Sequence, residues 1–127
     1  MHQGSCLCGK IIFQIESEPV AVSNCHCNMC QKQHGAAFAT YARFKRSQVN
    51  YLSGEDKLAV YQSSDNVQRK FCAGCGANIE WGYCSGEYAI WVAMALGLFD
   101  TKLVPETVKE LHKDTQVSWW KSASEIT

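Results

Sequence analysis

Short runs of apolar, β-branched and aromatic residues recur along the chain, and polar turn residues separate them. Runs of this length in which apolar and polar positions alternate are typical of β-strands. The predicted strands cover residues 10–15, 20–22, 36–44, 49–52, 58–61, 67–71, 78–81, 88–96 and 108–112. The fold class that follows is mostly β, with antiparallel strands and little helix.

Strands that follow one another closely are predicted to pair as hairpins. Residues 10–15 and 20–22 form one such hairpin, and residues 67–71 and 78–81 form another. The most apolar run, residues 88–96, is predicted to be the central buried strand, because a strand covered on both faces needs no polar positions. Its periodicity alone also fits a short buried helix.

Helix is predicted in one place only, after the cysteine at position 30. Residues 31–35 allow at most one helical turn before Gly35, a residue type that commonly ends helices. Residues 121–127 are polar, and we expect this end of the chain to fray.

The length and composition are those of one globular domain spanning residues 1–127. Hydrophobic residues make up 46% of the 127 positions and charged residues 19%. No apolar run approaches the roughly 20 residues that cross a bilayer, so we expect no membrane partner. The first residues lack a basic segment followed by an apolar run, which favours a cytoplasmic protein over a secreted one.

The net charge argues against nucleic acid as a partner. Twelve basic residues balance twelve acidic ones, so no long-range field would attract a polyanion. Two local basic groups, residues 43–46 and Arg69 with Lys70, are interpreted as solvated strand ends, although either could meet a small anionic ligand.

Eight cysteines are the one unusual feature of the composition. In a reducing compartment clustered cysteines bind metal or catalyse rather than form disulfides. Seven of them stand in close groups, Cys6-x-Cys8, Cys25-x-Cys27-x-x-Cys30 and Cys72-x-x-Cys75, and Cys84 stands alone. Such spacing is typical of thiolate ligands to zinc.

The seven clustered cysteines divide most simply into four and three. The two pairs Cys6/Cys8 and Cys72/Cys75 would make a closed site of four thiolates, which is structural. The remaining cysteines, Cys25, Cys27 and Cys30, would then bind a metal with one open position. A competing arrangement, in which Cys6 or Cys8 completes the second site, would leave one thiol of a close pair without a metal.

Several segments together resemble the glutathione-dependent formaldehyde-activating enzyme family, also called the centromere protein V family. The resemblance rests on Gly4-Ser5-Cys6-Leu7-Cys8-Gly9, Ser23-Asn24-Cys25-His26-Cys27-Asn28-Met29-Cys30-Gln31, Gly35-Ala36-Ala37-Phe38-Ala39, Phe71-Cys72-Ala73-Gly74-Cys75-Gly76, and the later Leu111-His112 and Trp119. It spans nearly the whole chain.

The resemblance implies a β-tent fold, two zinc ions and a carbon–sulfur lyase. The first and last cysteine motifs of the family hold a structural zinc and the middle motif holds a catalytic zinc, which corresponds to the same groups of four and three. The implied reaction joins glutathione to formaldehyde, so that the expected partner is a small-molecule thiol. A zinc ion that already has three thiolate ligands suits activation of a further thiol better than generation of hydroxide.

Two other function classes remain open at this point. The domain could be a zinc-stabilised binding module without catalysis, or a redox enzyme that uses Cys84. His26 is expected to pack or support the cysteine loop, His34 to border the open metal position, and His112 to be structural. Trp91, Trp119 and Trp120 are expected in a core or an interface.

Overall fold

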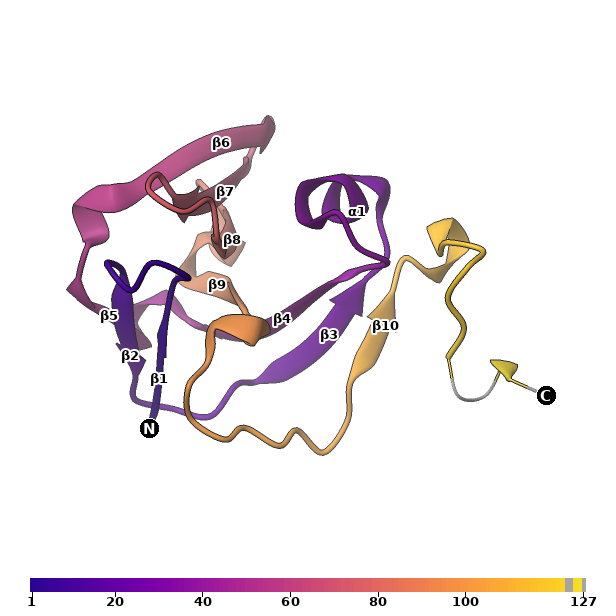
Figure 1. Cartoon of the computed structure of the whole chain (residues 1–127), viewed down its shortest axis with the longest axis horizontal. Coiled ribbons are helices and arrows are strands. Elements are labelled where there is room, and N and C mark those ends of the chain that lie inside the picture. The colour runs from indigo at the N-terminus through magenta and orange to yellow at the C-terminus, as the bar shows by residue number, and fades with distance from the viewer. Residues whose placement is uncertain (123–124, 127) are drawn as a thin grey trace.

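The fold is organised around a seven-stranded sheet that bends from one end of the molecule to the other (Figure 1). A computed structural model of the chain describes residues 1–122 and 125–126. The order of strands in this sheet is β10 (Lys109–Leu111), β3 (Ala21–Cys25), β4 (Ala39–Lys45), β9 (Trp91–Ala95), β8 (Asn78–Tyr83), β7 (Val67–Cys72) and β6 (Leu58–Ser64). All neighbours pair antiparallel except β10 and β3, which are parallel.

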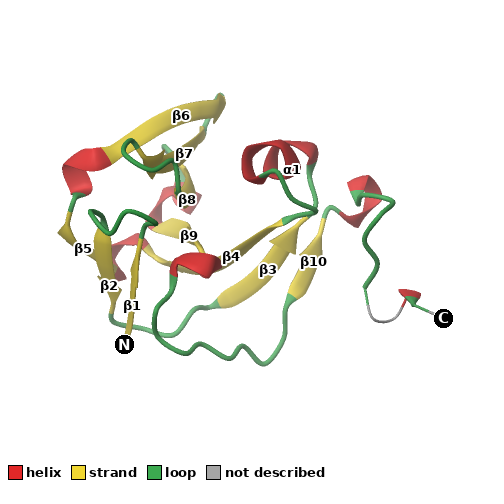
Figure 2. Ribbon diagram, viewed as in Figure 1, coloured by secondary structure: helices red, strands yellow, loops and turns green. Residues whose placement is uncertain are grey.

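A smaller sheet of three strands lies beside it (Figure 2). Its order is β1 (His2–Ser5), β2 (Ile12–Ile15) and β5 (Val49–Ser53). The helical elements are α1 (Asn28–His34) and short 3₁₀ turns at Arg46–Gln48, Glu55–Lys57, Glu87–Ile90, Leu96–Leu98 and Lys113–Thr115. The prediction of a mostly β fold with little helix is confirmed.

The predicted hairpin of residues 10–15 and 20–22 is wrong. Strand β2 pairs with β1 and β5 in the small sheet, whereas β3 pairs with β4 and β10 in the large one. The short connection between β2 and β3 therefore carries the chain from one sheet to the other. Alternation along a strand shows which residues share a face, but it does not identify the strand's partner. The later hairpin, β7 with β8, is confirmed.

Strand β9 occupies the middle of the large sheet, as predicted for the most apolar run. It begins only at Trp91, because Glu87–Ile90 forms a 3₁₀ turn instead of extended chain. Helix α1 is longer than the single turn that was predicted, since it already begins at Asn28, with Cys27 as its N-cap. It ends at Gly35 in the left-handed conformation, as expected.

The two faces of the large sheet have different roles. On β4 the buried side chains of Ala42 and Phe44 join the main core, while Tyr41 and Arg43 line a pocket on the opposite face. Their alternation follows from the two-residue period of a strand. The core lies between the two sheets, and its largest fully buried side chains include Phe13 from the small sheet and Phe44, Ile79, Met94 and Val92 from the large one.

One buried carboxylate links the two sheets. Glu80 on β8 is 4% exposed and accepts hydrogen bonds from Tyr51 of β5 at 2.5 Å and from Arg46 at 2.8 Å. Lys70 lies 3.5 Å from the same carboxylate. Burial raises the pKa of Glu80, but the hydrogen bonds from Tyr51 and Arg46 outweigh it and hold the pKa below the usual 4.5.

No helix within residues 1–122 and 125–126 has the length and apolar character needed to cross a membrane. Part of the segment expected to fray, residues 123–124 and 127, lies outside the described residues. Glu125 contacts Lys113 at 3.1 Å and accepts a hydrogen bond from Gln116 at 3.1 Å, so the chain is held there.

We expect Glu80→Gln to lower the free energy of unfolding by about 1–3 kcal/mol at pH 7, since it removes the charge that Arg46 and Lys70 contact. A carboxylate with a lowered pKa in the folded protein stabilises it above the unfolded-state pKa, and this stabilisation disappears as the pH falls through the folded-state value. The difference between wild type and variant should therefore shrink below about pH 4.5, as measured by urea unfolding across pH. The exposed Glu87→Gln is the control, and a difference that stays constant down to pH 3 would contradict the assignment.

Candidate metal centres and the adjoining pocket

Four cysteines from distant parts of the chain converge in what we call the four-thiol cluster, Cys6, Cys8, Cys72 and Cys75. All four sulfurs lie within 4.8 Å of one another, with Cys8 Sγ 3.5 Å from Cys6 Sγ and 3.8 Å from Cys72 Sγ. Zinc bonds of about 2.3 Å in a tetrahedron require sulfur separations of about 3.8 Å. The geometry therefore fits a single metal ion with four thiolate ligands.

Each half of the four-thiol cluster sits in a tight turn. Cys6 and Cys8 lie between β1 and β2, whereas Cys72 ends β7 and Cys75 lies in the turn that leads to β8. Gly9 and Gly76, which follow the second cysteine of each pair, have φ of 79° and 78°. This conformation is costly for residues with a Cβ, and it explains glycine at these two positions.

The remaining clustered cysteines, Cys25, Cys27 and Cys30, form a second group, which we call the three-thiol cluster. Cys25 ends β3, Cys27 caps α1, and Cys30 lies in the first turn of α1. The Cys27 sulfur accepts a hydrogen bond from the Cys30 backbone N–H at 3.3 Å, which holds the loop closed. Their sulfurs also lie within 4.8 Å of one another, so the structure brings the seven cysteines together as a group of four and a group of three, and neither Cys6 nor Cys8 lies in the second group.

Hydrogen bonding within the three-thiol cluster separates the pKa values of its members. The hydrogen bond from Cys30 lowers the pKa of Cys25 to about 5, against the opposing effect of burial. The same hydrogen bond and burial raise the pKa of Cys30, although Arg69 acts in the opposite direction. The first negative charge in the cluster therefore resides on Cys25.

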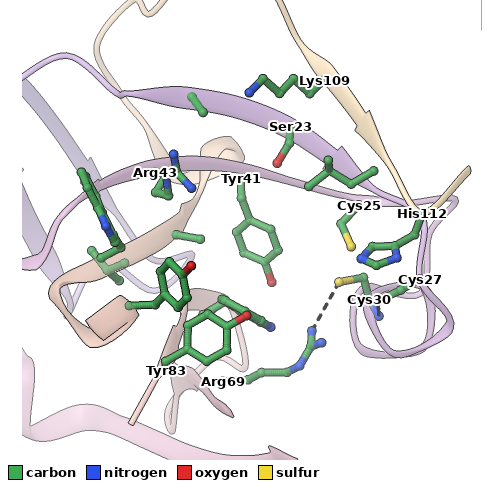
Figure 3. Close-up of a pocket in the computed structure, with 17 residues that line it drawn as sticks. Ser23, Cys25, Cys27, Cys30, Tyr41, Arg43, Arg69, Tyr83, Lys109 and His112 are labelled. Atoms are coloured by element: carbon green, nitrogen blue, oxygen red, sulfur yellow. Dashed lines mark hydrogen bonds between the residues drawn. The ribbon is translucent and has the colours of Figure 1, made fainter. Parts of the chain in front are cut away.

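A pocket of about 420 Å³ opens beside the three-thiol cluster (Figure 3), a size typical of small-molecule sites. Its lining comes from β3, β4, β7, β8, β9 and β10, the start of α1, the turn Glu87–Ile90 and the residue after β10. It consists of Ala21, Ser23, Cys25, Cys27, Cys30, Tyr41, Arg43, Arg69, Trp81, Tyr83, Tyr88, Trp91, Val92, Ala93, Lys109, Leu111 and His112. This lining includes three Lys or Arg side chains and no Asp or Glu. The pocket is thus cationic, with aromatic walls and thiols at one end.

The family-level comparison agrees with these features. A model of the family described as "Glutathione-dependent formaldehyde-activating enzyme" matches residues 1–122. The chain belongs to this family. The match includes both cysteine clusters and every residue that lines the pocket.

Individual relatives are more distant. An uncharacterized lyase of Schizosaccharomyces pombe is 28% identical over 86 residues, which cover 68% of this chain and 61% of that protein. A protein of Fusarium vanettenii, named as a candidate glutathione-dependent formaldehyde-activating enzyme, is 31% identical over 80 residues, or 56% of this chain and 43% of its own length. The chain therefore matches less than two thirds of the length of either relative.

Among solved structures, a crystal structure of a Rhodobacter sphaeroides protein superimposes with a TM-score of 0.66. The alignment covers 85% of this chain and 98% of that one, at 18% sequence identity. At this identity the similarity shows a shared fold.

The structure corrects the interpretation of Arg69 as a solvated strand end. Arg69 is 4% exposed, and its Nη1 donates to Gln33 Oε1 at 2.7 Å and to Cys30 Sγ at 3.5 Å. Its Nε donates to Ser63 Oγ at 3.1 Å. Burial lowers the pKa of Arg69, but the hydrogen bond to Cys30 and the electrostatic effects of Cys30, Tyr41 and Cys27 together raise it further, so the guanidinium remains charged.

The interpretation of residues 43–46 as solvated strand ends holds for the exposed Arg43 and Lys45, but it misses the contacts of Arg43 and Arg46. Arg43 lines the pocket and lies over the Trp91 ring, 5.2 Å from its centroid. Arg46 binds the buried Glu80. Trp91 is thus a wall of the pocket, whereas Trp119 is 71% exposed and does not lie in a core.

The histidines also differ from expectation. His112, expected to be structural, lines the pocket, and Figure 3 shows its imidazole beside the sulfurs of Cys25 and Cys30. It is the one residue other than glycine with positive φ among those described, at 58°, a conformation that residues at functional sites often adopt. The sequence placed His112 at the end of a predicted strand, but it did not predict that this strand lies beside β3.

His34 does not line the pocket but acts on it through Tyr41. Gln33 donates to Asn78 Oδ1 at 2.9 Å, which orients the Asn78 amide to donate to His34 Nδ1 at 3.4 Å. Burial lowers the pKa of His34, and the neutral ring then donates from Nε2 to Tyr41 Oη at 3.1 Å. Burial raises the pKa of Tyr41, so its own O–H remains available to a molecule in the pocket.

His26 has the supporting role that was expected. It is fully buried between Phe38 and Trp120, and its Nε2 lies 2.7 Å from Glu110 of β10. This contact ties the cysteine loop to β10. Cys84 is exposed and lies outside the pocket, within hydrogen-bonding reach of Gln62 alone among the described side chains.

The two clusters predict different outcomes of cysteine substitution in this family member. We expect purified protein to hold two metal ions per chain, and both Cys72→Ser and Cys30→Ser to hold one. Cys72→Ser should also unfold at much lower temperature, because a closed four-thiolate site contributes most of its binding energy to folding. Elemental analysis with thermal melting checks this, and equal melting temperatures for the two variants would contradict it.

Proposed function

We propose that this protein is a zinc-dependent carbon–sulfur lyase that joins a small thiol to formaldehyde, with glutathione as the candidate co-substrate. The observation that supports it is the position of the three-thiol cluster at the end of a cationic pocket, with no fourth His, Cys, Asp or Glu ligand in its group among the described residues. A closed cluster would be structural, whereas an incomplete one beside a pocket can accept a ligand.

The donor sets of both clusters suit zinc. Cys6, Cys8, Cys72 and Cys75 would hold the structural ion, and Cys25, Cys27 and Cys30 the catalytic one. When bound at the three-thiol cluster, zinc supplies a Lewis acid that favours the thiolate form of a thiol.

The reaction adds a thiol across a carbonyl group. A bond forms between the sulfur and the formaldehyde carbon, the π electrons of the carbonyl move to its oxygen, and that oxygen takes up the proton that the thiol releases. Tyr41 is placed to donate its O–H to the developing oxygen, because His34 occupies its acceptor side. His112, whose ring lies beside the cysteine sulfurs, offers a second polar hydrogen to the pocket.

The far end of the pocket suits carboxylates. Arg43 and Lys109 line it away from the cysteines, and Trp91 holds the Arg43 guanidinium in place. Glutathione carries two carboxylates beyond its thiol, which these cations could pair with.

The activity test uses protein shown by elemental analysis to hold two zinc ions. We expect it to accelerate exchange between formaldehyde and S-hydroxymethylglutathione, as measured by NMR exchange spectroscopy, and Cys30→Ser to lose at least about 100-fold of that rate. Cys84→Ser, outside the pocket, should retain it and so separates this proposal from a redox enzyme. Absence of acceleration by the fully loaded protein would instead favour a zinc-stabilised binding module.

The cationic end of the pocket gives a second test. We expect Arg43→Met to raise the KM for glutathione about 5- to 10-fold, as befits one partly exposed charge-assisted contact. The rate with 2-mercaptoethanol, which has no carboxylate, should stay the same. Lys45→Met, an exposed cation on the same strand outside the pocket, is the control, and an equal effect on both thiols would contradict a role in carboxylate binding.

A further inference from the structure

The buried cation Arg69 lacks a carboxylate partner among the described residues. Its hydrogen bonds go to Gln33, Ser63 and the sulfur of Cys30, and none of the ion pairs of residues 1–122 and 125–126 includes it. A buried charge without a counterion is strongly unfavourable. Since Arg69 is 4% exposed, the negative charge that offsets it must come from the thiolates beside it.

The two cysteine clusters differ in the charge of the hydrogen-bond donor that faces their sulfurs. Cys6 of the four-thiol cluster accepts a hydrogen bond from the backbone N–H of Ile11 at 3.4 Å, a neutral donor. Cys30 of the three-thiol cluster instead faces the Arg69 guanidinium at 3.5 Å (Figure 3). The positive charge is therefore placed at the cluster that borders the pocket.

Charge counting indicates what the guanidinium does there. Three thiolates and a divalent ion carry a net charge of about −1, and a fourth thiolate would raise this to about −2 in a partly buried site. With Arg69 included, the sums become about 0 and −1. A neutral fourth ligand adds no negative charge, so the guanidinium does not stabilise it as it stabilises a fourth thiolate.

We propose that Arg69 is a positioning residue that offsets the charge of the three-thiolate metal centre and thereby favours an anionic sulfur over a neutral ligand in the open position. This inference rests on the proposed metal site and deepens the proposed function. It assigns to Arg69 a preference between ligand classes and leaves bond formation to other groups.

The test compares two probes on cobalt-substituted protein, whose absorption bands report a change of ligand. The probes are 2-mercaptoethanol, which binds as a thiolate and carries no other charge, and imidazole, which binds neutral. We expect Arg69→Gln to weaken thiolate binding about tenfold or more, as suits opposite charges several ångströms apart, and to leave imidazole binding within about twofold. A merely structural role for Arg69 would change both affinities alike.

Because removal of a buried arginine can disturb folding, a second variant tests the same charge without removing it. Gln33→Glu places a carboxylate on the Arg69 Nη1, which now donates to Gln33 Oε1 at 2.7 Å, and so neutralises the guanidinium in place. It should lower the ratio of thiolate to imidazole affinity as Arg69→Gln does. Gln33→Met is the control without added charge: like Gln33→Glu it loses the hydrogen bond to Asn78, it also removes the acceptor for Arg69, and its ratio should equal that of wild type.

The inference is overturned if both Gln33 variants leave the ratio at the wild-type value, or if Gln33→Met lowers it as much as Gln33→Glu. Cobalt-loaded wild type that binds the thiolate but does not accelerate formaldehyde exchange when zinc-loaded would overturn the proposed reaction alone. Failure of wild type to bind a metal at Cys25, Cys27 and Cys30 would overturn both.

Discussion

Convergence of the four-thiol cluster is the constraint on which the rest of the structure depends. Cys6 and Cys8 lie in the turn between β1 and β2 of the small sheet, whereas Cys72 and Cys75 belong to the hairpin of β7 and β8 in the large sheet. A metal held by all four would fix one sheet on the other, and Glu80 with Tyr51 connects the same two layers nearby. The main core fills the space between them, so the apolar contacts and the cysteine contacts support one arrangement.

One face of the large sheet packs against the core, and the opposite face forms the pocket. Phe44 and Met94 point into the core from β4 and β9, and Tyr41 on the opposite face of β4 lines the pocket. The three-thiol cluster lies at the junction of β3 and α1, at one end of this face. The large sheet and the start of α1 thus place thiols, aromatic walls and cations around one cavity.

The site combines a soft donor set with an unusual electrostatic setting. Three thiolates would bring considerable negative charge to one end of the pocket. The lining offsets this charge with three cations: Arg69 lies beside the sulfurs, and Arg43 and Lys109 lie further away. A chain of hydrogen bonds runs from Gln33 through Asn78 and His34 to Tyr41, and Gln33 is also the partner of Arg69. The Arg69 charge beside the three-thiol cluster and the Tyr41 hydroxyl therefore belong to one hydrogen-bond network.

The sequence by itself determined most of the strands, the close spacing of the cysteines within each motif and the glycines that follow Cys8 and Cys75, because each depends on residues within a few positions of one another. It did not predict β1 or settle which cysteine motifs share a metal. The tertiary structure decided which strands pair, and for that reason the expected hairpin of residues 10–15 and 20–22 was wrong. It also decided that Arg69 is buried against Cys30 and that His112 meets Cys25, since both contacts join segments far apart in the chain. Local sequence patterns show the periodicity of a strand and the spacing of metal ligands. Whether a charged side chain is buried depends on which distant segments the fold packs against it.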